Sequence, residues 1–246
     1  STFDLAILLW IGVAAVVVPV ALMVPAPYGR HSRHGWGTMI DNKLGWIVME
    51  SPALVMVPIF FFSFQEEKSF VSYYFLCIWV LHYFHRTIIF PLRIKTKGKK
   101  MPISIAASAF CFNLVNTFFI GVYLGTHRYE VSWIADVRFL VGTILFFYGM
   151  CTNIWADYSL IALRTSTQSY QIPRGGLFEF VSCPNHFGEI VEWGGFALML
   201  WALPGLSFFC WTAANLIPRA TNHHTWYRKR FEDYPTNRKA VLPLIW

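Results

Sequence analysis

Charged residues are scarce in this chain of 246 residues. They make up 13% of it, whereas 56% of the residues are hydrophobic; an ordinary soluble domain is about 25% charged and about 45–50% apolar. The aromatic content of 18% and the mean hydropathy of +0.46 also exclude a disordered or collagen-like chain. The composition therefore indicates a membrane protein with several spans.

Several motifs of common chemistries are missing. The sequence contains neither GxGxxG nor GxxxxGK[ST], which excludes a Rossmann fold and a P-loop. The 5 cysteines are odd in number, have no CxxC spacing and lie mostly in apolar runs, and no GxSxG turn is present. His223 and His224 are adjacent, so on a helix they diverge by about 100° and cannot chelate one metal together. We therefore expect no disulfide framework, no metal site and no covalent catalysis.

Seven apolar runs approach the roughly 20 residues that a bilayer-spanning helix needs. They predict an all-α polytopic membrane protein with seven transmembrane helices. A hairpin between the last two runs should break at Leu203-Pro204, because proline disfavours helix at the residue before it; if the two runs are one bent element, the count falls to six. No basic segment precedes the apolar run from Leu5, so we expect a retained first helix rather than a signal peptide. The runs lie near residues 5–24, 44–64, 70–90, 102–124, 137–163, 187–203 and 204–218.

The basic residues are distributed unevenly between the predicted loops. Of the 20 lysines and arginines, sixteen fall on one side of a seven-helix arrangement, three on the other and one inside a span. The positive-inside rule then predicts an outside N-terminus and a cytosolic C-terminal tail at residues 219–246. The predicted topology thus accounts for the net charge of +7, and no nucleic-acid-binding function is needed to explain it. The segments outside the spans are shorter than the about 50 residues of a small domain, so residues 1–246 should form one domain, which we expect to be monomeric.

Ionisable groups inside spans are costly and need a partner or a function. Glu50 lies in the second run. It is either a carboxylate capped by a neighbouring helix or a hydrogen-bonding acid in a cavity. The third run carries HYFHRT, in which Tyr83 and Arg86 are three residues apart and share a helix face. Asn113 and Asn116 in the fourth run have the same spacing, which fits interhelical hydrogen bonds and site residues equally well.

Polar residues also gather near the cytosolic end of the fifth run. Asn153 and Asp157 are one helical turn apart, and Arg164 follows two turns later. A carboxylate and an amide on one face, with a basic residue beyond them, suit a ribose or an amide group with a phosphate nearby. A helix-terminal salt-bridge network is the alternative.

The segment that follows is polar and rich in turns. Asn185, Glu189 and Trp193 recur every four residues and form one stripe on a helix that enters the membrane. The turn at residues 173–176 (PRGG) offers exposed backbone N–H groups that can approach an anion. The tail is then a basic amphipathic helix on anionic lipid or the wall of a pocket for an anionic cofactor. Its polar residues are Arg219, His223, His224, Tyr227 and Arg228.

Taken together, these motifs resemble the steroid 5α-reductase family, membrane enzymes that reduce 3-oxo-Δ4-steroids with NADPH, and they are closest to its type 2 members. The likeness extends over almost the whole chain. The matching segments are PYGRHS at 27–32, the helix around Glu50, HYFHRT at 82–87, NIWADY at 153–158, residues 170–178, NHFGEIVEW at 185–193 and HHTWYRKRFEDYPTNRKAVLP at 223–243.

The resemblance implies seven helices, with NADPH held by the cytosolic loops and the lower half of the bundle. It also implies that Glu50 and Tyr83 bind the steroid 3-oxo group. Two departures stand out: Gln171 replaces an arginine frequent in relatives, and RIKTKGKKMP at 93–102 is more basic than its counterpart, as a lipid-facing loop. The positions similar to those that line the cofactor are Tyr28, Arg86, Asn153, Asp157, Arg164, Tyr170, Asn185, Glu189, Trp193, Arg219, His223 and Tyr227.

The chemistry of such a reduction sets requirements on the site. Hydride delivery to the β-carbon of an enone places negative charge on the ketone oxygen, so hydrogen-bond donors are needed there. Tyr83 can donate its phenol, and Glu50 can donate only when neutral, which burial favours; we expect it to be protonated or to share a proton with Tyr83. Arg164 and the tail arginines favour NADPH over NADH because they can pair with the 2′-phosphate.

The substrate should be a flat apolar ketone, such as a steroid, that enters laterally from lipid. The membrane is a bacterial inner membrane or the endoplasmic reticulum, with the cofactor site facing the cytosol. A related sterol double-bond reductase is one alternative. A membrane methyltransferase that uses S-adenosylmethionine is another, although that cofactor has no phosphates to pair with the arginines. A lipid transport protein is the third, but no paired repeat is visible in the sequence.

Overall fold

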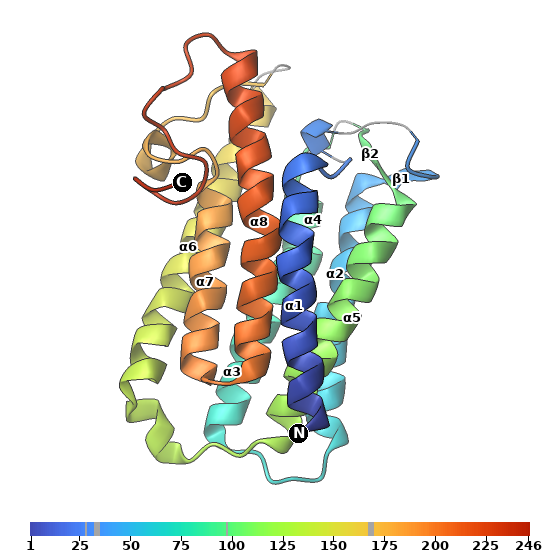
Figure 1. Cartoon of the computed structure of the whole chain (residues 1–246), viewed down its shortest axis with the longest axis vertical. Helices are drawn as coiled ribbons and strands as arrows, with labels where there is room; N and C mark the ends of the chain where they lie inside the picture. The colour runs from blue at the N-terminus through green and yellow to red at the C-terminus, as the bar shows by residue number, and fades with distance from the viewer. Residues whose placement is uncertain (28, 32–34, 97, 167–169) are drawn as a thin grey trace. The chain divides into compact units, whose positions relative to one another are not determined.

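The computed structural model describes residues 1–27, 29–31, 35–96, 98–166 and 170–246, most of which are helical (Figure 1). They form two compact units. Unit 1 comprises Ser1–Pro25 and Leu140–Trp246, and unit 2 comprises Ala26–Phe139. The helices of unit 1 are α1 (Thr2–Met23), α6 (Val137–Ser166, whose first turn belongs to unit 2), α7 (Pro184–Leu200) and α8 (Leu203–Arg230). Unit 2 contains α2 (Asn42–Ser63), α3 (Phe70–Phe84), α4 (Phe90–Arg93), α5 (Ile103–Thr126) and the strands β1 (Met39–Asp41) and β2 (Lys100–Pro102).

Five helical segments among the described residues are long and apolar enough to cross a membrane. They coincide with the first five predicted spans, and the third of them joins α3 and α4 through a π-helical turn at His85–Ile89. The helices α7 and α8 lie at the last two predicted runs without meeting that criterion, so the count of seven spans stays a prediction. The five segments are Thr2–Met23, Asn42–Ser63, Phe70–Arg93, Ile103–Thr126 and Val137–Arg164.

The break between α7 and α8 lies two residues before the predicted one. Helix α7 ends at Leu200, Trp201 is left-handed with φ of 47°, and α8 begins at Leu203. Pro204 therefore sits in the first turn of α8, where its missing N–H costs no helical hydrogen bond. The two helices are separate and pack against each other, so they are not one bent element.

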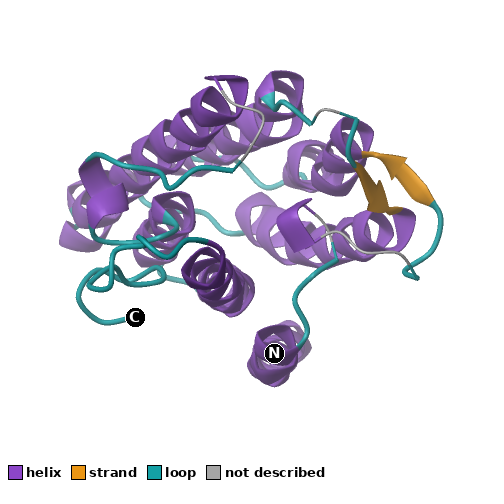
Figure 2. Cartoon of the chain, turned by 90° about the horizontal axis from the view of Figure 1, so that it is seen from above, coloured by secondary structure: helices purple, strands orange, loops and turns teal. Residues whose placement is uncertain are grey.

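A small antiparallel sheet departs from the all-α expectation. In unit 2, β1 pairs with β2 in the register Met39↔Pro102, Ile40↔Met101 and Asp41↔Lys100 (Figure 2). Asp41 also caps α2 by accepting hydrogen bonds from the N–H groups of Lys43 (2.9 Å) and Leu44 (3.1 Å). The loop that we expected to face lipid thus ends in a strand whose Met101 is fully buried. Strands of three residues are too short to show the alternating pattern by which strands are recognised.

Glycines allow α6 and α7 to approach closely in unit 1. A Cβ atom at Gly188 would lie 2.6 Å from the carbonyl oxygen of Gly149, and one at Gly195 would lie 2.6 Å from that of Gly142. Both members of each pair are therefore required to be small, as at other tightly packed membrane helices. The close contact brings polar residues inside α6 within hydrogen-bonding distance of polar residues in the first turns of α7.

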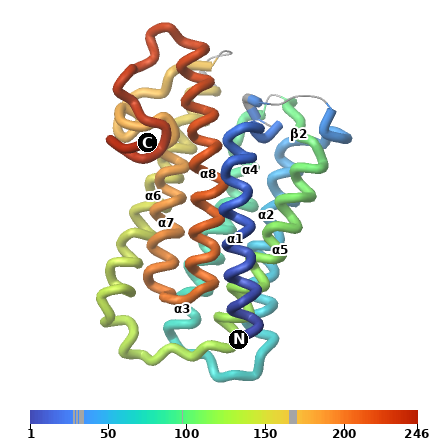
Figure 3. Tube along the Cα trace, in the orientation of Figure 1, coloured from blue at the N-terminus to red at the C-terminus, as the bar shows by residue number. Residues whose placement is uncertain are grey.

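Helix α8 joins α1 to the rest of unit 1. The Trp10 and Trp211 rings lie 4.6 Å apart, and Asn222 donates to the carbonyl oxygen of Ala21 (3.1 Å). Beyond α8 the chain turns back along the helix, as the tube in Figure 3 shows. The N-terminal end of α1 and the end of α8 that carries the tail lie at opposite ends of this unit (Figure 1).

Candidate functional site

Four of the predicted site residues form one hydrogen-bonded group in unit 1, which we call the α6–α7 polar cluster. Asn153 donates its amide to the carbonyl oxygen of Asn185 (3.0 Å) and to the carboxylate of Glu189 (3.2 Å). Asn185 donates in turn to the carboxylate of Asp157 (3.0 Å). Asn153 and Asp157 are only 2% and 5% exposed. The predicted pair on α6 and the first two members of the predicted stripe on α7 thus lie together.

The α6–α7 polar cluster is rich in carboxylate and amide oxygens. Such groups accept hydrogen bonds from hydroxyl and amide N–H donors, whereas phosphates need cations. Arg164 supplies a cation further along α6, about 10 Å from Asp157 at the helical rise, and its guanidinium lies 5.6 Å from the Tyr170 ring. Along α6, the polar cluster with the Asp157 carboxylate therefore comes first, and the cation of Arg164 follows.

Other predicted cofactor residues lie on α8 or in the aromatic packing of unit 1. Arg219 and His223 are partly exposed, and the His223 ring is 5.7 Å from the ring of His186 on α7. Tyr227 is buried and stacks on Tyr234 at 5.4 Å. Trp193 is 1% exposed and lies in an aromatic cluster outside the α6–α7 polar cluster. The rings around it belong to Phe146, Phe196 and Phe208.

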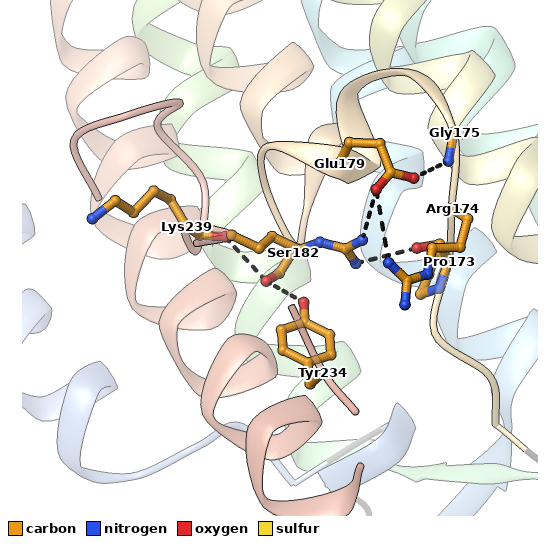
Figure 4. A network of polar contacts seen from close by, with 8 residues as sticks. Pro173, Arg174, Gly175, Glu179, Ser182, Tyr234 and Lys239 are labelled. Atoms are coloured by element: carbon orange, nitrogen blue, oxygen red, sulfur yellow. Dashed lines mark hydrogen bonds and ion pairs between the residues drawn. The ribbon is translucent and has the colours of Figure 1, made fainter. Parts of the chain in front are cut away.

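The turn at residues 173–176 is held by charged side chains (Figure 4). Glu179 accepts a hydrogen bond from the Gly175 N–H (2.6 Å) and lies 3.8 Å from the guanidinium of Arg174. Arg238 is 2% exposed; it donates to the carbonyl oxygen of Pro173 (3.1 Å) and lies 3.7 Å from Glu179. The expected exposed N–H at Gly175 is therefore occupied by a carboxylate of the chain itself. The reason is that the 3₁₀ turn at Gly176–Glu179 folds this side chain back onto the glycine.

Ser182 joins the segment before α7 to the tail. Its hydroxyl contacts the Nδ1 atom of His224 and the hydroxyl of Tyr234, both at 2.6 Å, and the carbonyl oxygen of Lys239 at 3.1 Å. Burial lowers the pKa of His224, and the nearby charges of Arg228, Arg238 and Lys239 lower it further. Burial likewise raises the pKa of Tyr234. Sequence reasoning missed the roles of Glu179, Ser182 and Arg238. The partners of Ser182 and Arg238 come from distant segments, and the contact of Glu179 with Gly175 depends on the 3₁₀ turn between them.

In unit 2, Glu50 has a polar neighbour on another helix. Asn113 on α5 donates its amide to the carbonyl oxygen of Met49 (2.6 Å) and lies 3.4 Å from the Glu50 carboxyl oxygen Oε2. A carbonyl oxygen can only accept, so the contact with Met49 fixes the amide with its nitrogen toward α2. Thr87 donates to the Glu50 carbonyl oxygen (3.3 Å). Asn113 thus both connects two helices and lies beside the predicted acid.

Tyr83 and Arg86 lie where the α-helical pattern changes. Tyr83 is 4% exposed, and its ring is 4.8 Å from that of Trp79. Arg86 belongs to the π-helical turn, and its guanidinium lies 5.0 Å from the Trp46 ring and 4.7 Å from the Phe90 ring. The shared face that we predicted assumed a regular α-helix, and a π-helical turn changes that spacing; such turns are frequent at functional sites. Tyr28, the remaining predicted residue, lies outside the described residues.

Together, these observations define a largely helical protein with five segments long and apolar enough to cross a membrane and with groups of polar residues between its helices. Within the part of the chain described here, no group of three or more His, Cys, Asp and Glu side chains could hold a metal ion. A family model described as 3-oxo-5-alpha-steroid 4-dehydrogenase matches residues 99–246.

Curated relatives match most of the chain. Steroid 5-alpha-reductase DET2 of Gossypium hirsutum is 43% identical over 228 residues, which are 90% of this chain and 88% of the relative. The protein of the same name from Arabidopsis thaliana is 43% identical over 230 residues, with the same coverage. 3-oxo-5-alpha-steroid 4-dehydrogenase 1 of Bos taurus is 36% identical over 230 residues, 91% of this chain and 89% of the relative. The chain belongs to the steroid 5α-reductase family, which confirms the resemblance of its motifs. The closer likeness to type 2 members stays a prediction.

Proposed function

We propose that this protein reduces the Δ4 double bond of 3-oxo-Δ4-steroids to 5α-3-oxosteroids with NADPH. The observation that carries this proposal is family membership, with identities of 36% and 43% over about nine tenths of the chain. Two groups of polar residues, each buried or half-buried, give the proposal its chemistry. Unit 2 supplies hydrogen-bond donors for a ketone, and unit 1 supplies partners for a nucleotide.

The polar residues of unit 1 fit NADPH. The carboxylates of Asp157 and Glu189 and the amides of Asn153 and Asn185 suit ribose hydroxyls and the nicotinamide amide. Arg164 would pair with the 2′-phosphate, and Arg219 and His223 would face other parts of the nucleotide. Bound in this way, NADPH supplies the hydride.

Glu50 and Tyr83 would act on the steroid 3-oxo oxygen. When hydride reaches C5, the electron pair of the double bond moves toward that oxygen, and addition of a proton from water at C4, as the 3-oxo group re-forms, completes the reduction. Tyr83 donates its phenol to the oxygen, and a neutral Glu50 donates its carboxyl proton. Both donors are in place before the charge develops, and so they stabilise the transition state more than the ground state.

Asn113 would determine which oxygen of Glu50 carries the proton. Its amide nitrogen faces Oε2 and can only donate, so Oε2 acts as the accepting oxygen of the neutral carboxyl. The proton then belongs on Oε1, from which Glu50 would donate to the ketone. Asn113 is a positioning residue in this proposal, because it acts through Glu50.

The proposed topology has seven spans, with an outside N-terminus, a cytosolic tail and a cytosolic cofactor site. Within unit 1, α1 begins at one end and α8 ends at the other (Figure 1), which supports this topology. The uneven distribution of basic loop residues supports it as well. The protein would be a monomer in an endoplasmic reticulum or bacterial inner membrane. The steroid would enter laterally from lipid, where a flat apolar ketone is concentrated.

The first experiment follows NADPH oxidation by purified protein with testosterone or progesterone, beside Glu50→Gln and Tyr83→Phe. Each variant should lower kcat by about 10²–10³-fold, the usual effect of losing one such donor, while NADPH affinity is retained. A wild type that binds NADPH but reduces neither steroid would show that the substrate is wrong. A protein that binds no NADPH would contradict the proposed activity itself.

Arg164→Ala tests the nucleotide assignment. The ratio of kcat/KM for NADPH to that for NADH should fall at least about tenfold, the effect of losing one charge-assisted hydrogen bond. Arg128→Ala is the matched control, since Arg128 pairs with Glu67 at the protein surface. An unchanged preference in Arg164→Ala would remove Arg164 from this role.

A further inference from the structure

We infer that residues 241–246, which we call the tail turn, dock on the anionic lipid surface at the cytosolic face of the bilayer. Three consecutive apolar side chains of the tail turn are exposed. Leu244 is 84% exposed, Ile245 77% and Trp246 51%. This surface is separate from the residues that we assign to steroid and nucleotide.

The tail turn has a fixed conformation. The carbonyl oxygen of Trp246 accepts hydrogen bonds from the N–H groups of Val241 and Leu242, both at 2.8 Å. The N–H of Trp246 donates to the carbonyl oxygen of Leu242 (3.0 Å), and Leu244 is left-handed with φ of 67°. Val241 is fully buried in an apolar cluster that includes Ala220. The hydrogen bonds and the buried Val241 side chain hold residues 244–246 in a conformation that points their side chains away from the apolar cluster.

The tail turn lies at the level where α8 leaves the predicted membrane region. The Trp246 indole donates to the hydroxyl of Thr221 (3.0 Å). Thr221 is three residues beyond the predicted end of the last span at Pro218, a rise of about 4.5 Å. Next to it, Asn222 contacts Ala21, near the end of the highly apolar helix α1. Two helices of unit 1 therefore mark the same boundary, and the tail returns to it (Figure 3).

The charges beyond this boundary select an anionic lipid surface as the partner. Arg228, Lys229 and Arg230 are exposed on α8, about 10–14 Å further along the helix than Thr221. Cationic side chains at this depth attract anionic headgroups, and tryptophan is enriched at the level just below them. Leu244 and Ile245 would enter the outer part of the acyl region, which removes their exposed surface from water.

Photo-crosslinking tests this inference. Ile245 or Leu244 is replaced by the photoreactive analogue benzoylphenylalanine in the full chain, which is reconstituted in vesicles of phosphatidylcholine and phosphatidylglycerol. Asn237, an exposed tail residue outside the tail turn, is replaced in the control. Adducts are identified by intact mass after irradiation. We expect severalfold more lipid adduct at positions 244 and 245 than at 237, and a larger yield with phosphatidylglycerol than with phosphatidylcholine alone.

A second measurement leaves Leu244 and Ile245 unchanged. The difference in fluorescence between the wild type and Trp246→Phe isolates the signal of Trp246, which brominated lipids should quench. Crosslinks to protein instead of lipid, yields at 244 and 245 no higher than at 237, or an unquenched Trp246 would each overturn the inference. None of these outcomes depends on NADPH or on steroid turnover.

Discussion

Two asparagines on α5, Asn113 and Asn116, differ in the helix to which their side chains donate a hydrogen bond. Asn113 donates across to α2 beside Glu50, whereas Asn116 donates to the carbonyl oxygen of Phe112 in its own helix (2.8 Å). Their spacing in the sequence treats them alike. At the scale of the residue, position relative to a reacting group therefore decides function.

Asn113→Leu should lower kcat for steroid reduction by about tenfold, the value of one lost hydrogen bond in the transition state. KM for NADPH should not change, because Asn113 lies beside Glu50, which we assign to the steroid and not to the nucleotide. The pH profile of kcat should shift as well, since Glu50 loses the donor that faces Oε2. Steady-state kinetics over a range of pH measure both effects.

Asn116→Leu is the matched control on the same helix. An equal loss of kcat in the two variants, with no change in either pH profile, would assign Asn113 a purely structural role.

At the scale of the element, glycines set the distance between α6 and α7. A methyl group at Gly188 would meet the Asn153 N–H and the Gly149 carbonyl oxygen, both at 2.6 Å. These atoms belong to the backbone and cannot move away as a flexible side chain can. The geometry of the α6–α7 polar cluster therefore depends on residues that have no side chain.

Gly188→Ala should destabilise the protein by about 1–3 kcal/mol, as overpacking does, and should weaken NADPH binding. Gly12→Ala is the control, since a Cβ atom at Gly12 meets nothing within 4 Å. Thermal unfolding in detergent and NADPH titration measure both effects. If Gly188→Ala binds NADPH as tightly as the wild type, the close contact of the helices does not form the nucleotide site.

The tail should loosen in acid because of His224. Its folded-state pKa is below the ordinary value of 6.5, so the folded protein favours the neutral ring. The unfolded state then binds more protons below about pH 6.5, and the stabilisation by neutral His224 is lost as the pH falls toward the folded pKa. The protection factors for backbone hydrogen exchange at residues 239–242, which correct for the pH dependence of exchange in an unfolded chain, should therefore be lower at about pH 5.5 than at about pH 8.

His224→Gln should reduce this pH dependence while leaving the exchange at high pH similar. An identical fall in the protection factors on acidification in wild type and variant would show that another group controls the tail.

At the scale of the whole molecule, the proposed topology places two exposed loop positions on opposite sides of the membrane. Glu66 lies between α2 and α3, and Asn237 lies in the tail. In sealed vesicles, a membrane-impermeant maleimide should label only one of Glu66→Cys and Asn237→Cys, and lysis should expose the other. The wild type, whose 5 cysteines are free, provides the background. Labelling of both variants from one side would contradict the seven-span arrangement.

Properties that depend on one segment at a time could be predicted from the sequence. Five of the seven predicted runs coincide with helices that are apolar enough to cross a membrane, because hydropathy is a sum over neighbouring residues. Polar motifs inside those runs, such as HYFHRT and NIWADY, indicated the family, which the comparisons confirmed. The separation of Asn153 and Asp157 by one helical turn follows from helical geometry alone.

Contacts between distant segments were decided by the tertiary structure. Asn113 is 63 residues from Glu50, and Ser182 is 52 residues from Tyr234, so no local spacing could pair them. The ion pair of Glu179 with Arg238 and the pairing of β1 with β2 likewise depend on how the chain folds back. The sequence determined which segments are helical and which family they belong to, because hydropathy and motif are local. Packing, with glycines at the closest contacts, decided which polar groups meet.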